Sequence, residues 1–218
     1  IVNIGLEGMM VIGTWFGAWA GWFYGPWYGV LAGLLGGALF GLIHAVGTIT
    51  FQVDHIVSGV AINILAAGVA RFLSVVAYAD VPAGGATQSP RVDERIEKIS
   101  IPYLSGGKIN ESDTADVFGS LEALDLFLIS DLFGLMGGLT RNISYFSILA
   151  VLLVPVSVWI LWSTSFGLQL RSVGEYPVGS ESVGVNVYLM KYIGVTISGA
   201  FAGLAGAYLV IELSLIHI

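Results

Sequence analysis

Long apolar runs separated by short polar breaks dominate the chain. A helix that crosses the hydrocarbon core of a bilayer needs about 20 mostly apolar residues. Several runs reach or approach this length, and each predicts a membrane-spanning helix. They are residues 4–24, 27–50, 55–78, 144–163 and 188–211. The pattern therefore predicts an all-α fold, a polytopic transmembrane bundle of about five spans.

One further apolar run is weaker, because two aspartates interrupt it. Residues 121–139 contain Asp125 and Asp131, so they predict either a re-entrant or interfacial segment or a full span. This run belongs to a longer and mostly polar stretch, residues 80–142, which we expect to form a loop outside the bilayer. By the number of intervening spans, the polar residues 164–187 then face the opposite side of the membrane.

Small residues recur at every fourth position within the apolar runs. Such spacing places a flat face on a helix, where another backbone approaches closely. It predicts a densely packed bundle and carries no chemistry of its own. The series are Gly13, Gly17 and Gly21; Gly25, Gly29, Gly33, Gly37 and Gly41; and Gly194, Ser198, Ala202 and Gly206.

Composition agrees with a membrane protein, since 56% of the 218 residues are hydrophobic and 11% are charged. A soluble domain is nearer one quarter charged. The net charge of −7 argues against nucleic acid as a partner, because phosphate binding needs clustered Lys and Arg. The absence of cysteine excludes disulfides and thiolate metal sites.

Motifs for catalysis are missing from the sequence. It contains neither HExxH nor a Gly-rich phosphate-binding loop ending in Lys-Ser/Thr. His55 precedes Ser58 by one helical turn, but no third group completes a nucleophile–base arrangement. We therefore expect no catalytic residue, no cofactor and no metal site, and a transport subunit rather than an enzyme.

Polar residues inside the apolar runs are costly in a membrane and are often functional. Glu7 follows Asn3 by one turn and lies between Gly5 and Gly8, so NIGLEG predicts a bent or broken helical segment. Such segments border water-filled paths in transporters. Glu7 either lines such a path or meets water at the interface. Asn63 either lines the path or joins two helices by hydrogen bonds.

The polar stretch GLQLRSVGEYPVGSESVGVNV, residues 167–187, predicts a short helix between two spans. Pro177 suits a first helical turn, Glu175 lies near the positive helix end, and Gly184 suits a helix stop. The segment is either a helix that docks a partner or a solvated loop. If a partner docks, Glu181 is available for one of its basic residues.

Three segments resemble one family of membrane proteins. GLQLRSVGEYP (167–177) resembles the GLRLRAVGENP signature of bacterial ABC importer permeases for simple sugars, nucleosides and branched-chain amino acids. NIGLEGMMVIG (3–13) and VDHIVSGVAINILA (53–66) resemble two more segments of that group, in the same order. The residues of these two segments favour the nucleoside or simple-sugar subgroup.

The resemblance implies a permease in the bacterial cytoplasmic membrane that works with three kinds of protein. These are a second permease subunit, identical or different, a cytoplasmic ABC ATPase and an extracytoplasmic substrate-binding lipoprotein. It places residues 164–187 in the cytoplasm and residues 80–142 outside. It implies ATPase coupling through Arg171, Val173, Gly174, Glu175 and Pro177, with Glu181 beside them, and a translocation path near Asn3, Gly5, Glu7, Gly8 and Asn63.

The coupling segment departs from the family pattern at several positions. Gln169 stands where a second arginine is usual, Tyr176 replaces Asn, and Gly179-Ser180 replaces Ala-Ala. Gly and Ser lower helix propensity. We therefore expect a shorter or more mobile coupling helix.

The leading hypothesis is an ABC importer permease that moves nucleosides or simple sugars by alternating access. A branched-chain amino acid permease of the same family and an ion-coupled secondary transporter are the alternatives. A non-transporting scaffold is a third class. Glu7 is the one carboxylate that the ion-coupled mechanism could use near the middle of the membrane.

Both ends of the chain are expected to be cut. Residue 1 is Ile, and the chain opens inside an apolar pattern. The final LSLIHI, residues 213–218, is what the transposon-end adapter sequence CTGTCTCTTATACACATC encodes. We expect these six residues to be adapter read-through and assign them no function.

Overall fold

The computed structural model divides the chain into two compact units, Ile1–Arg95 with Ser157–Ile218, and Ile96–Val156. The residues that it describes are 3–79, 81, 85, 89–90, 96, 98–100, 108–109, 112–113, 116–123 and 143–212. The expected adapter residues 213–218 and nearly all of the uncertain run 121–139 lie outside this set.

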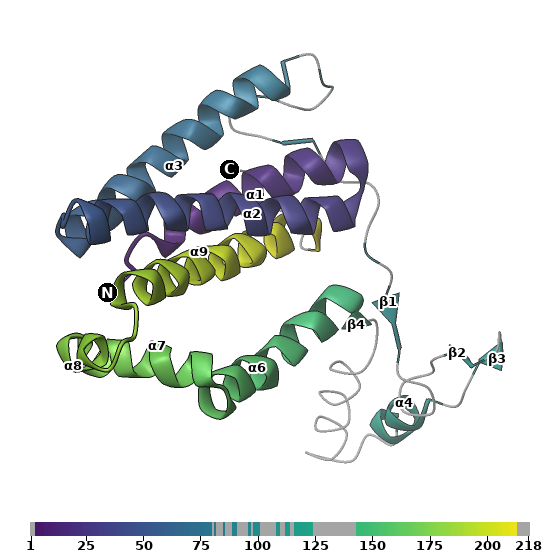
Figure 1. Ribbon diagram of the computed structural model, residues 1–218. Coiled ribbons are helices and arrows are strands. Elements are labelled where there is room, and N and C mark those ends of the chain that lie inside the picture. Colours follow the sequence, from purple (N-terminus) through teal and green to yellow (C-terminus); the bar gives the residue numbers. More distant parts are fainter. Residues whose placement is uncertain are drawn as a thin grey trace. The chain divides into compact units, whose positions relative to one another are not determined.

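The first unit is a bundle built around three helices in mutual contact, α1 (Leu6–Tyr24), α2 (Pro26–Ala45) and α9 (Val187–Ile211). A short π-helix, η1 (Val46–Thr50), continues α2, and α3 (His55–Ala77) packs on α1. Figure 1 shows that α3 and α9 begin at the end of the bundle where α2 finishes, and that α1 and α2 run in opposite directions. The chain therefore crosses the bundle in alternating directions along α1, α2 and α3.

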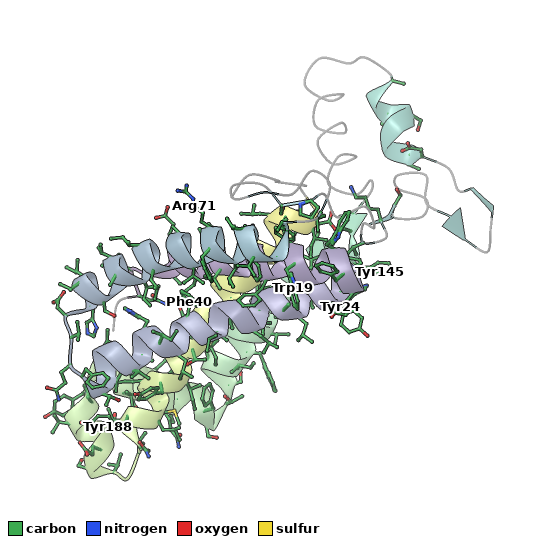
Figure 2. The ribbon with its side chains drawn as sticks, turned by 90° about the horizontal axis from the view of Figure 1, so that it is seen from above. Trp19, Tyr24, Phe40, Arg71, Tyr145 and Tyr188 are labelled. Atoms are coloured by element: carbon green, nitrogen blue, oxygen red, sulfur yellow. The ribbon has the colours of Figure 1, made fainter. Side chains whose placement is uncertain are left out.

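The turn between α1 and α2 depends on its two central residues. Gly25 has φ 101°, a backbone conformation that side chains with a Cβ rarely adopt, and Pro26 occupies the first helical position. Aromatic residues gather near this turn, where Trp19 and Tyr24 lie, and Tyr188 lies near the opposite end of the bundle (Figure 2). Aromatic residues are enriched at the headgroup regions of a bilayer.

Glycines permit a close helix contact between α2 and α9. A Cβ at Gly203 would lie 2.7 Å from the Cα of Gly37, and one at Gly199 would lie 2.8 Å from the Cα of Gly41. Real Cβ atoms do not approach backbone this closely, so both positions need glycine. The glycine spacing of the sequence thus corresponds to a backbone-to-backbone contact between helices far apart in the chain.

Three helices precede α9, namely α6 (Tyr145–Ser163), α7 (Ser165–Glu175) and α8 (Pro177–Ser182). Thr164 separates α6 from α7, and its side-chain oxygen accepts the N–H of Gly167 at 3.1 Å. We predicted one short helix between the last two apolar runs. The structure has two, because Ser165–Glu175 also forms a helix, which is amphipathic. In Figure 1, α7 and α8 lie near the end of the bundle where α9 begins.

The second unit contains the short helix α4 (Val117–Glu122) and two pairs of very short antiparallel strands. β1 (Lys98–Ile99) pairs with β4 (Ile143–Ser144), and β2 (Lys108–Ile109) pairs with β3 (Ser112–Asp113). The Asp116 side chain caps α4 by accepting the N–H of Gly119 at 2.8 Å.

The structure confirms the predicted all-α, polytopic fold class. Within the described part of the chain, the helices long and apolar enough to cross a membrane are Pro26–Thr50, His55–Ala77, Tyr145–Ser163 and Val187–Ile211. The first of these combines α2 with η1. The fifth expected span, residues 4–24, is helical from Leu6 to Tyr24 but is not among the helices that meet this length and hydropathy criterion.

Candidate functional site

The first turn of α1 is capped by a side chain from another helix. Gly5 occupies the N-cap position and has no side chain that could accept a hydrogen bond. Instead, Gly8 N–H donates to Asn63 Oδ1 at 2.8 Å, and Asn63 Nδ2 donates to the carbonyl oxygen of Ile4 at 3.4 Å. An N-cap side chain normally satisfies this amide. Asn63 does so from α3, and it thereby holds the start of α1 against that helix.

Glycines on both helices make this contact possible. A Cβ at Gly8 would lie 2.8 Å from the Cα of Asn63, and a Cβ at Gly59 would lie 2.9 Å from the Cβ of Ile4. At Gly5 the nearest atom would be Ile62 Cγ2, at 3.1 Å. The glycines of NIGLEG therefore allow α1 to begin in direct contact with the α3 backbone.

Asn3 connects the same region to α9. Its Nδ2 donates to Ser198 Oγ at 3.1 Å, and its Oδ1 accepts the N–H of Gly5 at 3.1 Å. At a rise of 1.5 Å per residue, Asn63 lies about 12 Å along α3 from its first residue, His55. Ser198 lies about 16 Å along α9 from its first residue, Val187. Helix α1 therefore begins well inside the length of α3 and α9. NIGLEG was predicted to form a bent or broken helical segment, and in the structure α1 begins within it, at Leu6.

A cavity of about 1040 Å³ lies beside this helix start, within the first unit. Its walls are largely apolar, and Glu7, Ser157 and Ser198 contribute polar side chains. The remaining lining residues come from α1, α6, α7 and α9 and are Leu6, Met10, Ile160, Leu161, Phe166, Leu170, Gly194, Ile197, Phe201 and Ala202. A pocket with apolar walls and a few polar groups has the form and size of a small-molecule site.

The five residues proposed for the translocation path have different positions. Asn3, Gly5, Gly8 and Asn63 meet at the start of α1, where their contacts join three helices. Glu7 lines the cavity. Of the two alternatives for Asn63, the hydrogen bonds to α1 correspond to the one in which it joins two helices.

The second candidate region is the pair α7 and α8. Pro177 occupies the first position of α8, and Gly184, with φ 86°, follows the helix end. The short helix predicted from these two residues is therefore present, at Pro177–Ser182. The guanidinium carbon of Arg171 lies 4.1 Å from the centre of the Trp162 ring, a cation–π geometry.

The residues proposed for ATPase coupling do not share one surface. Val173 is buried with Val187 and Met190 and packs α7 against α9. By contrast, Gly174, Glu175 and Glu181 are exposed, whereas Arg171 and Pro177 are partly buried. Val173 thus has a packing role between helices, and the exposed residues are those that a partner could reach directly.

One buried polar pair was not predicted. His44 is fully buried, and its Nδ1 lies 2.9 Å from Ser58 Oγ, although the sequence suggested His55 as the neighbour of Ser58. The pair joins the end of α2 to the start of α3, and Thr48 Oγ1 donates to the His44 carbonyl at 2.8 Å. A sequence signal did exist, since both residues are polar and flank the break at 51–54. Among the described residues, no group of three or more His, Cys, Asp or Glu could hold a metal ion.

A family-wide sequence profile matches the whole chain, residues 1–218, and its description is "Branched-chain amino acid transport system / permease component". The chain belongs to this permease family. The resemblance stated from the three sequence segments is thereby confirmed, and the chain is a multi-pass membrane protein of a transport family. A transport subunit, rather than an enzyme, is what membership of this family indicates.

Two curated relatives are similar over nearly all of the chain. The guanosine ABC transporter permease protein NupQ of Bacillus subtilis is 39% identical over 213 residues, which are 94% of this chain and 57% of that protein. The nucleoside ABC transporter permease protein NupC of Lactococcus lactis is 34% identical over 214 residues, 95% of this chain and 57% of that protein. The chain thus spans a little over half the length of these relatives. No solved structure matches it.

Proposed function

We propose that this chain is part of the membrane-spanning permease subunit of an ATP-driven importer for nucleosides. The observation that carries the proposal is the 39% identity with a guanosine permease across 94% of this chain. The identity with a second nucleoside permease supports the same substrate class. Transport would occur by alternating access in the bacterial cytoplasmic membrane, and the substrate would leave chemically unchanged.

The proposed path for the substrate runs beside the start of α1. The cavity of about 1040 Å³ supports this, because it has room for a nucleoside and offers a carboxylate and two hydroxyl groups between apolar walls. Glu7 would accept hydrogen bonds from the ribose hydroxyls or the base. Asn3 and Asn63, with Gly5 and Gly8, would position that carboxylate by holding the helix start against α3 and α9.

The proposed contact with the ATPase is made by α8 and the end of α7, on the cytoplasmic side. Glu175 and Glu181 are exposed there, as a basic surface on a partner would require. Movement of α8 would reach the bundle through α7, because Val173 packs against Val187 and Met190 at the start of α9. ATP hydrolysis itself would take place on the separate ATPase subunit.

Two further partners complete the proposed importer. A second permease subunit, identical or different, would lie beside this one in the membrane. A substrate-binding lipoprotein would deliver nucleosides from outside, at the side that carries residues 80–142. The family assignment supports these partners in general, since such permeases work in multi-subunit importers.

The proposal is tested by reconstituting the full-length permease with its ATPase and binding protein in lipid vesicles. We expect uptake of radiolabelled guanosine that requires ATP and is lost with a catalytically inactive ATPase. Unlabelled nucleosides should compete, whereas glucose and leucine should not. Uptake that persists without ATP and stops when the proton gradient is dissipated would instead favour an ion-coupled transporter. Competition by leucine alone would favour an amino acid permease.

A further inference from the structure

Of the four residues at which the coupling segment departs from its family pattern, Tyr176, Gly179 and Ser180 are in contact with one another. A Cβ added at Gly179 would overlap the ring of Tyr176, at its Cδ1 and Cε1 atoms. The ring of Tyr176 therefore occupies the space that an alanine side chain at residue 179 would fill. Ser180 Oγ donates to the carbonyl oxygen of Tyr176 at 3.0 Å. Tyr176, Gly179 and Ser180 thus form one local arrangement rather than three independent changes.

The backbone of Tyr176 joins α7 to α8. Its N–H donates to the carbonyl oxygen of Ser172 at 2.9 Å, which closes α7. Its carbonyl oxygen accepts the N–H of Ser180 at 3.0 Å, in addition to the Ser180 hydroxyl, which opens α8. Tyr176 is therefore the C-cap of α7 and the N-cap of α8 at once. Its position fixes the direction in which α8 leaves α7.

The side chain of Tyr176 remains accessible although one part of it rests on Gly179. Its exposed fraction is 65%, and Val183, at the other end of α8, is 78% exposed. Exposed side chains with apolar surface therefore lie at both ends of this short helix. Tyrosine is also enriched among the residues that dominate binding energy at protein interfaces.

We propose that the Tyr176 side chain makes the main binding contact with the ATPase subunit. Gly179 holds the ring in place, because the ring packs where a Cβ at residue 179 would lie. This inference rests on the proposed function, in which α8 docks the ATPase. A ring already packed on the helix backbone loses little conformational freedom on binding, so the pre-organised side chain favours affinity. The Tyr176–Gly179 pair thereby compensates for the lower helix propensity of Gly179 and Ser180. It also makes this permease selective for an ATPase whose surface accepts an aromatic ring.

The test measures binding of the purified ATPase subunit to the full-length permease in lipid nanodiscs. Tyr176→Ala should weaken binding roughly tenfold or more, as for other interface anchors. Tyr176→Phe should retain the affinity of the unaltered protein, since the ring is preserved. Gly179→Ala keeps the ring but fills the space in which it packs, so this variant should also weaken binding. The double variant Tyr176→Ala with Gly179→Ala should bind no more weakly than Tyr176→Ala alone.

The matched control is Gly68→Ala, a helical glycine whose added Cβ would meet no atom within 4 Å. This variant should bind the ATPase like the unaltered protein. The inference is overturned if Tyr176→Ala binds at full strength, or if the losses from the two single substitutions simply add. Either result would leave the proposed function intact, because the unaltered permease would still bind the ATPase. Failure of the unaltered permease to bind would contradict both proposals.

Discussion

Asn63 on α3 accepts the backbone N–H of Gly8 on α1 at 2.8 Å, and it donates to the carbonyl oxygen of Ile4. The amide thus serves a helix other than its own. Within the hydrocarbon region no water is available to satisfy a free backbone N–H. A helix that begins inside a bundle, as α1 does, therefore needs a donor–acceptor side chain from a neighbour.

Replacing Asn63 with Ala should destabilise the permease by about 1–3 kcal/mol, because the Gly8 amide would lose its acceptor in an apolar environment. The measurement is the apparent Tm of the purified protein in detergent. Ile64→Ala is the control, since Ile64 is 71% exposed on the adjacent position of the same helix. Equal losses of Tm in the two variants would contradict a specific capping role for Asn63.

The contact between α2 and α9 gives a second prediction. Gly203→Ala should lower the Tm and the yield of folded protein, since the new Cβ would lie 2.7 Å from the Cα of Gly37, on a backbone that cannot move aside. Overpacking of this kind costs about 1–3 kcal/mol or more. Gly68→Ala, made on an open helix face, should leave the Tm nearly unchanged. A Gly203→Ala protein as stable as this control would show that the two helices separate easily.

Periodicity was enough to predict the bundle, and its limits appear at particular residues. The glycine series predicted close packing, but no local pattern could pair Gly203 with Gly37, because they are far apart in the chain. Pro177 and Gly184 located α8 correctly, since both act through their own backbone. The α7 helix was missed because its polar residues resembled a loop.

In the candidate site, too, the sequence predicted which residues matter but not which residues they contact. The sequence singled out Asn63 and Glu7 as polar residues in apolar surroundings, but it could not tell a residue that joins helices from one that lines a cavity. That distinction depends on tertiary contacts. Likewise, His55 is nearer to Ser58 in sequence, whereas His44 reaches Ser58 in the fold because the chain turns back at 51–54.

The His44–Ser58 pair predicts a third effect. Ser58→Ala should lower the Tm by an amount that corresponds to about 1–3 kcal/mol, because a fully buried ring nitrogen would lose its hydroxyl partner. Val57→Ala is a suitable comparison, since Val57 is 62% exposed beside it. Ser58→Thr keeps the hydroxyl group and should lose less stability than Ser58→Ala. The reverse order would show that space, rather than the hydrogen bond, decides the stability at this position.

Glu7 gives the prediction that bears most directly on transport. Glu7→Gln should raise the KM for nucleoside uptake by roughly tenfold or more, because a neutral amide accepts hydrogen bonds less strongly than a carboxylate. The Tm should stay close to that of the unaltered protein, since Glu7 is exposed to the cavity rather than packed among core residues. The measurement is initial uptake rate against guanosine concentration in vesicles with the complete importer.

Met10→Leu is the control for Glu7→Gln, because Met10 lines the same cavity and leucine nearly preserves its volume. Its KM should change by less than about threefold, consistent with a small loss of apolar contact. An unchanged KM in Glu7→Gln would mean that the carboxylate only meets water at the edge of the cavity. A raised KM accompanied by a lowered Tm would mean that Glu7 stabilises the fold of α1 and does not contact the substrate. Only a raised KM at constant Tm agrees with a carboxylate that contacts the transported nucleoside.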